Sequence, residues 1–275
     1  MDRSRVRSAE SGHQHQERRH GRSRRPFRII AHRGASGYAP ENTMAAFERA
    51  VAMGAVEVET DVSFTRDHRL LLLHDDTLDR TTNGSGLPEH YTLEELKRLD
   101  AGSWADARLA WDRDYRGERL ITLDELLDRF GDTLTYHVEI KKPMPGLVPA
   151  VIGAIRDRGL IDRVFIAAMD DDASLQEALR LAPGIRVASA PVARIRENAR
   201  AAVEDCAARG YAMVTLAAWN HSRELVDLAH GLGIEARSSG IADRTQMIEA
   251  AEMGCNGMTI NWPDWLMDYV RDRRT

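Results

Sequence analysis

The sequence predicts an α/β fold, a (β/α)8 TIM barrel with a small insertion after the second barrel strand. First, short runs rich in β-branched residues alternate with amphipathic helical patterns along the chain. Second, eight such units occupy about 250 residues, the number and length that this barrel requires. Third, neither a GxGxxG turn nor a phosphate-binding P-loop follows a strand, which disfavours an open doubly wound sheet.

The predicted barrel strands are short and are mostly separated by helical segments. In chain order the strands are Phe27–His32, Val56–Asp61, Leu134–Lys141, Val164–Met169, Ile185–Ala190, Tyr211–Leu216, Ile234–Ser239 and Gly257–Asn261. The predicted helices include Asn42–Met53, Leu123–Phe130, Ala173–Leu181, Arg194–Ala208, Ser222–Leu232 and Arg244–Met253. Glycine stands where a left-handed residue commonly ends a helix, at Gly54, Gly131, Gly184, Gly233 and Gly254.

Two segments interrupt the alternation. Leu70–Asp75 is strand-like, but it follows the second strand after only a short turn, and a parallel pair needs a longer crossover. We therefore expect a hairpin strand that lies outside the barrel. Residues from about 76 to 121 form an irregular insertion with one expected helix at Thr92–Leu99. Long insertions of this kind commonly shape an active site.

The composition excludes several classes of protein. With 275 residues, 43% hydrophobic and 29% charged, the chain is typical of a globular protein. No apolar run approaches the ~20 residues of a membrane-spanning helix, so stable membrane insertion is not expected. Cys206 and Cys255 cannot form a disulfide scaffold and lie in no CxxC zinc pattern. The formal net charge of −5 gives no reason to expect nucleic acid as a partner.

Residues 1–26 differ from the rest, with eight Arg, three acidic residues and almost nothing apolar. We expect a disordered basic leader here and the barrel domain at residues 27–275. A basic arm for nucleic acid or anionic lipid is the less favoured alternative. Ser23–Phe27 resembles a twin-arginine export signal, but no apolar segment follows it, so we expect a cytoplasmic protein.

Acidic side chains gather where predicted strands end, which is the face that carries the active site in this fold. Glu59 and Asp61 end the second strand on one face, because side chains alternate along a strand. Glu139 ends the third predicted barrel strand. Three carboxylates at one barrel mouth would repel one another without a cation, and oxygen ligands favour Mg²⁺ or Ca²⁺ over zinc. Glu57 lies deeper and can instead pair with an arginine in the lower barrel.

Two histidines stand at the same face, where imidazole can give or take a proton near neutral pH. His32 ends the first strand and His74 ends the hairpin. Lys141, one of three lysines in the chain, follows Glu139 by two residues and suits a phosphate oxygen. His137 either bonds a ligand carboxylate or fills the barrel, and we favour filling. Glu41 lies at a helix start and can also face the site.

These residues, in this order, resemble the glycerophosphodiester phosphodiesterase family. The matching segments span Ile29 to Asp264 and are IAHRGASGYAPENTMAAFERAVAMGA, VEVETDVSFTRDHRLLLLHDDTLDRTTNGSG, ITLDELLDRF, VEIKKP and GCNGMTINWPD. The resemblance implies hydrolysis of a small glycerophosphodiester to glycerol 3-phosphate and an alcohol. It implies one divalent cation, Mg²⁺ or Ca²⁺, on the three carboxylates. It also implies His32 and His74 as the acid/base pair, with Arg33 and Lys141 on the phosphate.

The last third of the chain departs from the family pattern. Arg237-Ser238-Ser239-Gly240 stands in place of a Trp-Thr-Val-Asn-like stretch, and Asn261 replaces an acidic residue near the end. We hypothesise that Arg237 suits an anionic head group and that Trp262 replaces the missing aromatic surface as a substrate contact.

Two other functions stay open at this point. One is a lysophospholipase D or sphingomyelinase D-like activity on the same barrel, for which the insertion offers Trp104, Trp111 and Tyr115 as an apolar entrance. The other is a non-catalytic barrel that binds phosphate or lipid. The sequence does not fix the oligomeric state.

Overall fold

The structure, a computed structural model, describes residues 27–104, 111 and 113–273. Eight parallel strands form a closed barrel, because β1 pairs with both β2 and β9 and every other barrel strand pairs with its neighbours. The predicted (β/α)8 barrel is therefore confirmed, whereas the predicted leader lies outside the described residues. The barrel strands are β1 (Arg28–His32), β2 (Glu57–Phe64), β4 (Thr135–Ile140), β5 (Val164–Met169), β6 (Arg186–Ala190), β7 (Met213–Ala217), β8 (Glu235–Ser239) and β9 (Gly257–Ile260).

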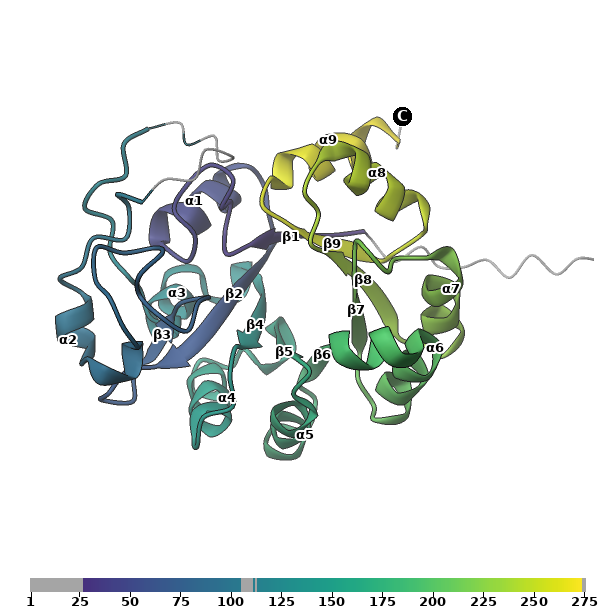
Figure 1. Cartoon of the computed structure of the whole chain (residues 1–275), viewed down its shortest axis with the longest axis horizontal. Helices are drawn as coiled ribbons and strands as arrows, with labels where there is room; N and C mark the ends of the chain where they lie inside the picture. Colours follow the sequence, from purple (N-terminus) through teal and green to yellow (C-terminus); the bar gives the residue numbers. More distant parts are fainter. Residues whose placement is uncertain (1–26, 105–110, 112, 274–275) are drawn as a thin grey trace, which may run out of the picture.

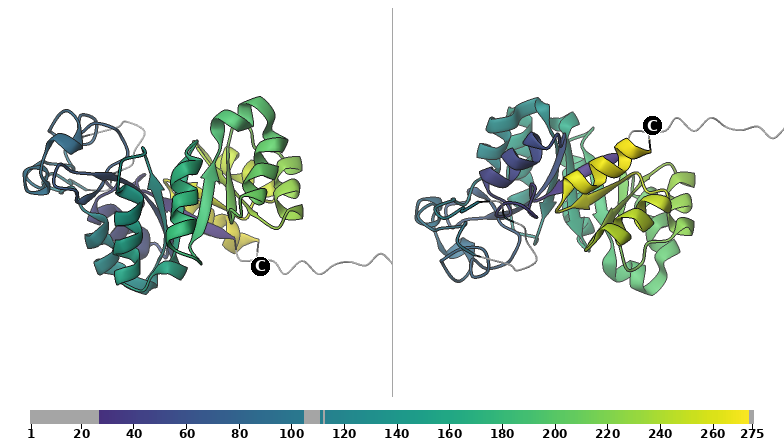
Figure 2. Two further views of the ribbon diagram at one scale, coloured as in Figure 1. Left: turned by 90° about the horizontal axis from the view of Figure 1, so that it is seen from below. Right: turned by 90° about the horizontal axis from the view of Figure 1, so that it is seen from above.

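Helices surround the strands on the outside of the barrel (Figures 1 and 2). They are α1 (Met44–Ala52), α3 (Leu123–Phe130), α4 (Leu147–Asp157), α5 (Asp172–Leu181), α6 (Val192–Ala208), α7 (Arg223–Gly231), α8 (Arg244–Glu252) and α9 (Pro263–Asp272). The glycines that we expected to end helices all have positive φ angles. No helix in the described part of the chain combines the length and the apolar character needed to cross a membrane.

Two helices that the sequence patterns did not indicate, α4 and α9, complete the ring. Pro149 lies within the first turn of α4, and Pro263 is the first residue of α9. Proline is tolerated there because the first backbone N–H groups of a helix have no partner within the helix. Helix α1 begins at Met44, two residues later than expected, and Thr43 is its capping residue.

The hairpin prediction is confirmed. Strand β3 (Leu70–Leu72) runs antiparallel to the outer part of β2, with Val62 paired to Leu72. In its described residues the insertion that follows contains a 3-10 helix (Pro88–His90) and the short helix α2 (Leu93–Leu96), which is shorter than the predicted Thr92–Leu99. Helix α2 lies on the same side of the barrel as α1 and α3, away from α6 and α7 (Figures 1 and 2). Apolar side chains of the hairpin and the insertion together form a small separate core, namely Leu71, Leu73, Leu78, Leu96, Ala101 and Leu120.

A partly buried ion cluster closes the end of the barrel opposite the site. Arg28 donates to both carboxylate oxygens of Glu57, at 2.9 and 3.1 Å, and to Glu235 at 2.7 Å. The His137 ring lies 3.0 Å from Glu57 and stacks on Phe165. Glu57 therefore takes the alternative role open to it, pairing with an arginine of the lower barrel, and His137 fills the interior.

Candidate active site at the carboxyl ends of the strands

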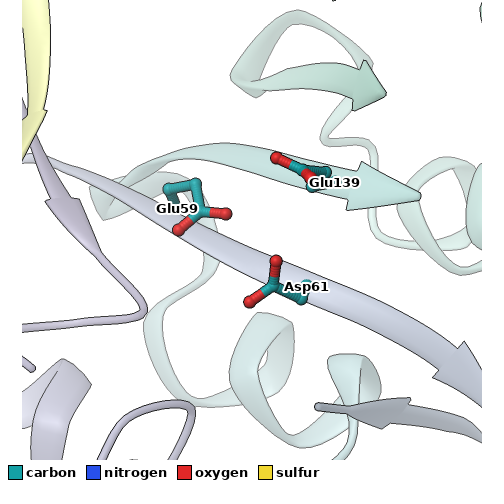
Figure 3. Close-up of side chains that lie close together, drawn as sticks. All are labelled: Glu59, Asp61 and Glu139. Carbon is teal, nitrogen blue, oxygen red and sulfur yellow. The ribbon is translucent and has the colours of Figure 1, made fainter. Parts of the chain in front are cut away.

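Three carboxylates converge at the mouth of the barrel. Glu59 and Asp61 project from β2, and Glu139 projects from the neighbouring strand β4, where it is paired in register with Asp61 (Figure 3). Each residue offers an oxygen that lies within 4.8 Å of the others. The first two side chains are 2% and 1% exposed. This is the spacing that alternation along two adjacent parallel strands produces.

Burial makes this cluster costly without a cation. Burial and the negative charges of Asp61 and Glu139 raise the pKa of Glu59 well above its usual value. Burial also opposes ionisation of Asp61, but Arg33, His74, Lys141 and a hydrogen bond from Asn42 together lower its pKa. An all-carboxylate donor set of this kind fits a hard divalent cation such as Mg²⁺ or Ca²⁺.

Two cations border the carboxylates. The Arg33 backbone N–H donates to Glu59 at 3.0 Å, and its guanidinium Nε lies 3.3 Å from Asp61. The Lys141 ammonium donates to Glu139 at 3.0 Å and lies 3.7 Å from Asp61. The predicted phosphate contacts thus lie beside the predicted metal ligands, where an anion bound to the cation would meet both.

The His32 ring lies at the rim of the cluster. Its Nδ1 is 2.6 Å from Oδ1 of Asn261, and its Nε2 is 3.8 Å from Glu59. Because an amide oxygen only accepts hydrogen bonds, Nδ1 carries the proton and Nε2 of the neutral ring is free to accept one. Burial and the Arg33 charge lower the pKa of His32 to about 3, so the ring is neutral near pH 7.

His74 reaches the same place from the hairpin. The backbone N–H of Leu73 donates to the carbonyl oxygen of Asp61 at 3.1 Å, which fixes the end of the hairpin against β2. The His74 Nδ1 atom is 2.7 Å from a carboxylate oxygen of Asp75. Its charge is among those that lower the pKa of Asp61. The structure therefore brings both predicted histidines to the carboxylate cluster.

The turn after β1 depends on Gly34. Arg33 and Gly34 have φ angles of 55° and 80°, and this left-handed pair directs the Arg33 N–H at Glu59. A Cβ atom on Gly34 would lie 2.5 Å from the backbone of Ala46, at the start of α1. Only glycine combines this backbone conformation with such a close approach.

Gly34→Ala should therefore destabilise the protein by about 3 kcal/mol, through left-handed strain and overpacking. Gly117→Ala is the matched control, because Gly117 has a φ of +90° but its Cβ would meet nothing within 4 Å. We expect about 1 kcal/mol for that variant. Urea unfolding measures both, and equal losses would show that the approach to Ala46 does not matter.

Other predicted residues lie near the site in different roles. Glu41 has its carboxylate between two guanidinium groups, at 2.8 Å from Arg33 and 2.7 Å from Arg80. Trp262 is 9% exposed and stacks on Trp265 at 4.5 Å, so most of its ring area is used in packing. Both side chains thus have partners within the protein, and their role as substrate contacts stays a prediction.

Arg237 does not stand at the rim. It is 4% exposed inside the barrel, where it donates to the Thr215 hydroxyl at 2.9 Å and lies 3.4 Å from Nδ1 of His137. The hypothesis of a head-group contact has no support from this position. The guanidinium instead lies below the cluster as a buried positive charge, which favours ionisation of Glu59.

Sequence reasoning missed several residues that orient the site. Asn42 donates to Asp61 at 3.0 Å and accepts from Thr60 at 2.8 Å, although its place at a helix start suggested only a cap. Asn261 was noticed as a departure from the family but not as the partner of a histidine. Arg80, in the insertion, contacts two acidic residues near the site; it lies in a segment that matches the family, but that match gave it no role.

The sequence matches known proteins over most of its length. Residues 32–265 match the glycerophosphoryl diester phosphodiesterase family. A glycerophosphodiester phosphodiesterase of Bacillus subtilis is 32% identical over 87% of this chain and 85% of that protein. A putative one from the same organism, YhdW, is 51% identical, but the match covers 41% of this chain and 44% of that protein.

The fold also matches solved structures. A phosphodiesterase from Oleispira antarctica, solved in complex with the product sn-glycerol-3-phosphate, is 27% identical. It superposes with a TM-score of 0.76 over 89% of this chain and 96% of that one.

Proposed function

Because the chain belongs to the glycerophosphoryl diester phosphodiesterase family, we propose that it hydrolyses glycerophosphodiesters to glycerol 3-phosphate and an alcohol. The observation that carries this proposal is the convergence of two imidazoles and three carboxylates at one barrel mouth. The product bound to the Oleispira antarctica relative supports the same substrate class.

Glu59, Asp61 and Glu139 would hold the divalent cation, Mg²⁺ or Ca²⁺. When bound, this ion neutralises phosphate charge and so makes an anionic phosphodiester easier to attack. Arg33 and Lys141 contribute further positive charge at the same place and orient the phosphate. Their contacts to the carboxylates hold both groups at the cluster before substrate arrives.

The two histidines are suited to move protons. The Nδ1 atom of His32 is engaged by Asn261 and that of His74 by Asp75, which leaves Nε2 of each ring for proton transfer. We propose that one Nε2 accepts the proton of the neighbouring glycerol hydroxyl as its oxygen bonds to phosphorus, while the other protonates the oxygen of the leaving alcohol. Water then opens the resulting cyclic phosphate with the two proton transfers reversed, which gives glycerol 3-phosphate. Such positioned acid/base groups each contribute about 10²–10⁴-fold.

Chelation and substrate choice test the proposal. We expect EDTA to abolish release of glycerol 3-phosphate from glycerophosphocholine, and added Mg²⁺ or Ca²⁺ to restore it. Full activity after exhaustive chelation would contradict the metal assignment. A preference for lysophosphatidylcholine over glycerophosphocholine would instead favour the lysophospholipase D alternative.

The structure gives that alternative little support. The Trp111 ring packs edge-on against Trp104 and Tyr115, at centroid distances of 5.1 and 5.7 Å. Tyr115 is only 4% exposed. These rings therefore pack on one another, whereas an entrance for an acyl chain would present their faces to solvent.

A further inference from the structure

One guanidinium of the insertion, that of Arg80, binds two carboxylates near the barrel mouth. Arg80 donates through Nε and Nη2 to the two carboxylate oxygens of Asp75, at 2.5 and 2.8 Å. It donates through Nη1 and Nη2 to the two oxygens of Glu41, at 2.8 and 2.7 Å. The planar fork of an arginine can hold two carboxylates in fixed positions in this way, and a lysine cannot.

Each of these carboxylates holds a residue of the proposed chemistry. The Asp75 oxygen that Arg80 binds at 2.8 Å also lies 2.7 Å from Nδ1 of His74. The Glu41 oxygen that Arg80 binds at 2.7 Å also accepts from Arg33 at 2.8 Å. One side chain of the insertion is thereby in contact with the partners of both a proposed acid/base group and a proposed phosphate contact.

The exposed fractions of Glu41 and Arg80 indicate how Arg80 affects its partners. The Glu41 side chain is 9% exposed, and Arg33 is already shared with Asp61. Burial alone would favour the neutral form of Glu41, but its bonds to Arg80 and Arg33 lower its pKa. Arg80 is itself 41% exposed, with the Trp104 ring 5.6 Å from its guanidinium carbon. An ion pair with a partner this exposed adds little to the free energy of unfolding. We therefore expect Arg80 to act by holding its two carboxylate partners in position.

We propose that Arg80 is a positioning residue that holds His74 through Asp75 and Arg33 through Glu41, and so fixes the two sides of the active site relative to each other. The proposal rests on the proposed function, because it assigns Arg80 a part in the same reaction. Small displacements of reacting groups have large effects on rate, so this link should matter more for turnover than for folding.

The test is a set of variants assayed with glycerophosphocholine and saturating Mg²⁺ or Ca²⁺. Arg80→Met should lower kcat/KM by about 10–100-fold, the usual cost of losing a partner of an active-site ligand or base. Arg80→Lys should recover only part of this, because an ammonium cannot bind both carboxylates bidentately. Arg98→Met is the matched control, since Arg98 forms an exposed ion pair with Glu94 in the same insertion. That variant should retain wild-type kinetics.

Two further readouts separate positioning from a structural effect. Asp75→Asn should act mainly on kcat, because Asp75 holds the proposed acid/base residue His74. Glu41→Gln should act mainly on KM, because Glu41 holds the proposed phosphate contact Arg33. Arg80→Met should change both. Adding Arg80→Met to either variant should cost much less than it costs in the wild type, because the link is already broken. Added methylguanidine should restore part of the activity of Arg80→Ala.

The outcomes are distinguishable. Arg80→Met with kcat and KM within two-fold of an active wild type would overturn the inference and leave the proposed function intact. Fully additive effects in the double variants, or losses matched by a falling melting temperature, would overturn it in the same way. A wild type that does not hydrolyse glycerophosphocholine with either ion would overturn both.

Discussion

His32→Ala should lower kcat by about 10²–10⁴-fold while leaving the fold intact. The substitution removes the Nε2 atom that faces the carboxylates and leaves the strand backbone unchanged, since His32 is the last residue of β1. Among the described residues its side chain hydrogen-bonds Asn261 at the rim, and it is 31% exposed, so the substitution removes little from the barrel core. Steady-state release of glycerol 3-phosphate measures the effect, and circular dichroism checks the fold.

His90→Ala is the matched control, because His90 is exposed in the insertion and contacts no residue of the cluster through its ring. It should retain wild-type turnover. If His32→Ala retained it too, the proton-transfer role would have to pass to another group. A loss of turnover accompanied by unfolding would not support the role either, because the prediction requires an intact barrel.

The carboxylate cluster could be predicted because it depends only on local rules. Side chains alternate along a strand, so Glu59 and Asp61 had to share a face. Parallel strands of a barrel end at the same mouth, so Glu139 had to lie near them. The hairpin at Leu70–Leu72 followed from connection length in the same way. Each of these inferences uses residues close in sequence or a general property of the fold.

The partners of the site residues could not be predicted, because they depend on contacts between distant segments. Asn261 lies 229 positions from His32 in the sequence, and only closure of the barrel brings them together. Arg80 reaches Glu41 across 39 positions from an irregular segment without periodicity. A sequence pattern also could not distinguish Trp262 as a core residue from Trp262 as a pocket wall, since both uses favour an aromatic side chain.

Glu59→Gln should abolish binding of the divalent cation and lower turnover by about 10³-fold, since the charge stabilisation that the ion supplies is worth several kcal/mol. Glutamine keeps the shape and can still accept the Arg33 N–H, so the change removes one negative charge and little else. Isothermal titration with Mg²⁺ and Ca²⁺ measures the binding, and the hydrolysis assay measures the turnover. Glu94→Gln, on the exposed face of α2, is the matched control.

In the absence of cation, Glu59→Gln should not lose stability although it loses turnover. This combination distinguishes the loss of a metal ligand from damage to the fold. Burial and the adjacent carboxylates raise the pKa of Glu59 above its unfolded value. The protonated form therefore favours folding at low pH, and this contribution is lost as the pH rises through the folded-state pKa. Because glutamine resembles the protonated form, Glu59→Gln should be at least as stable as the wild type near pH 7 in EDTA.

Added Mg²⁺ or Ca²⁺ should make the wild type more stable than Glu59→Gln. At about 100 times its dissociation constant, a ligand that binds only the folded state adds about 2.7 kcal/mol, or about 5 °C in melting temperature for a chain of this size. The wild type should gain this and Glu59→Gln should not. A variant that melts below the wild type in EDTA, or that gains as much from the ion, would show that Glu59 is not held ionised among its neighbours by a bound cation. In that case the convergence of Glu59, Asp61 and Glu139 would need another explanation, such as a proton shared among them.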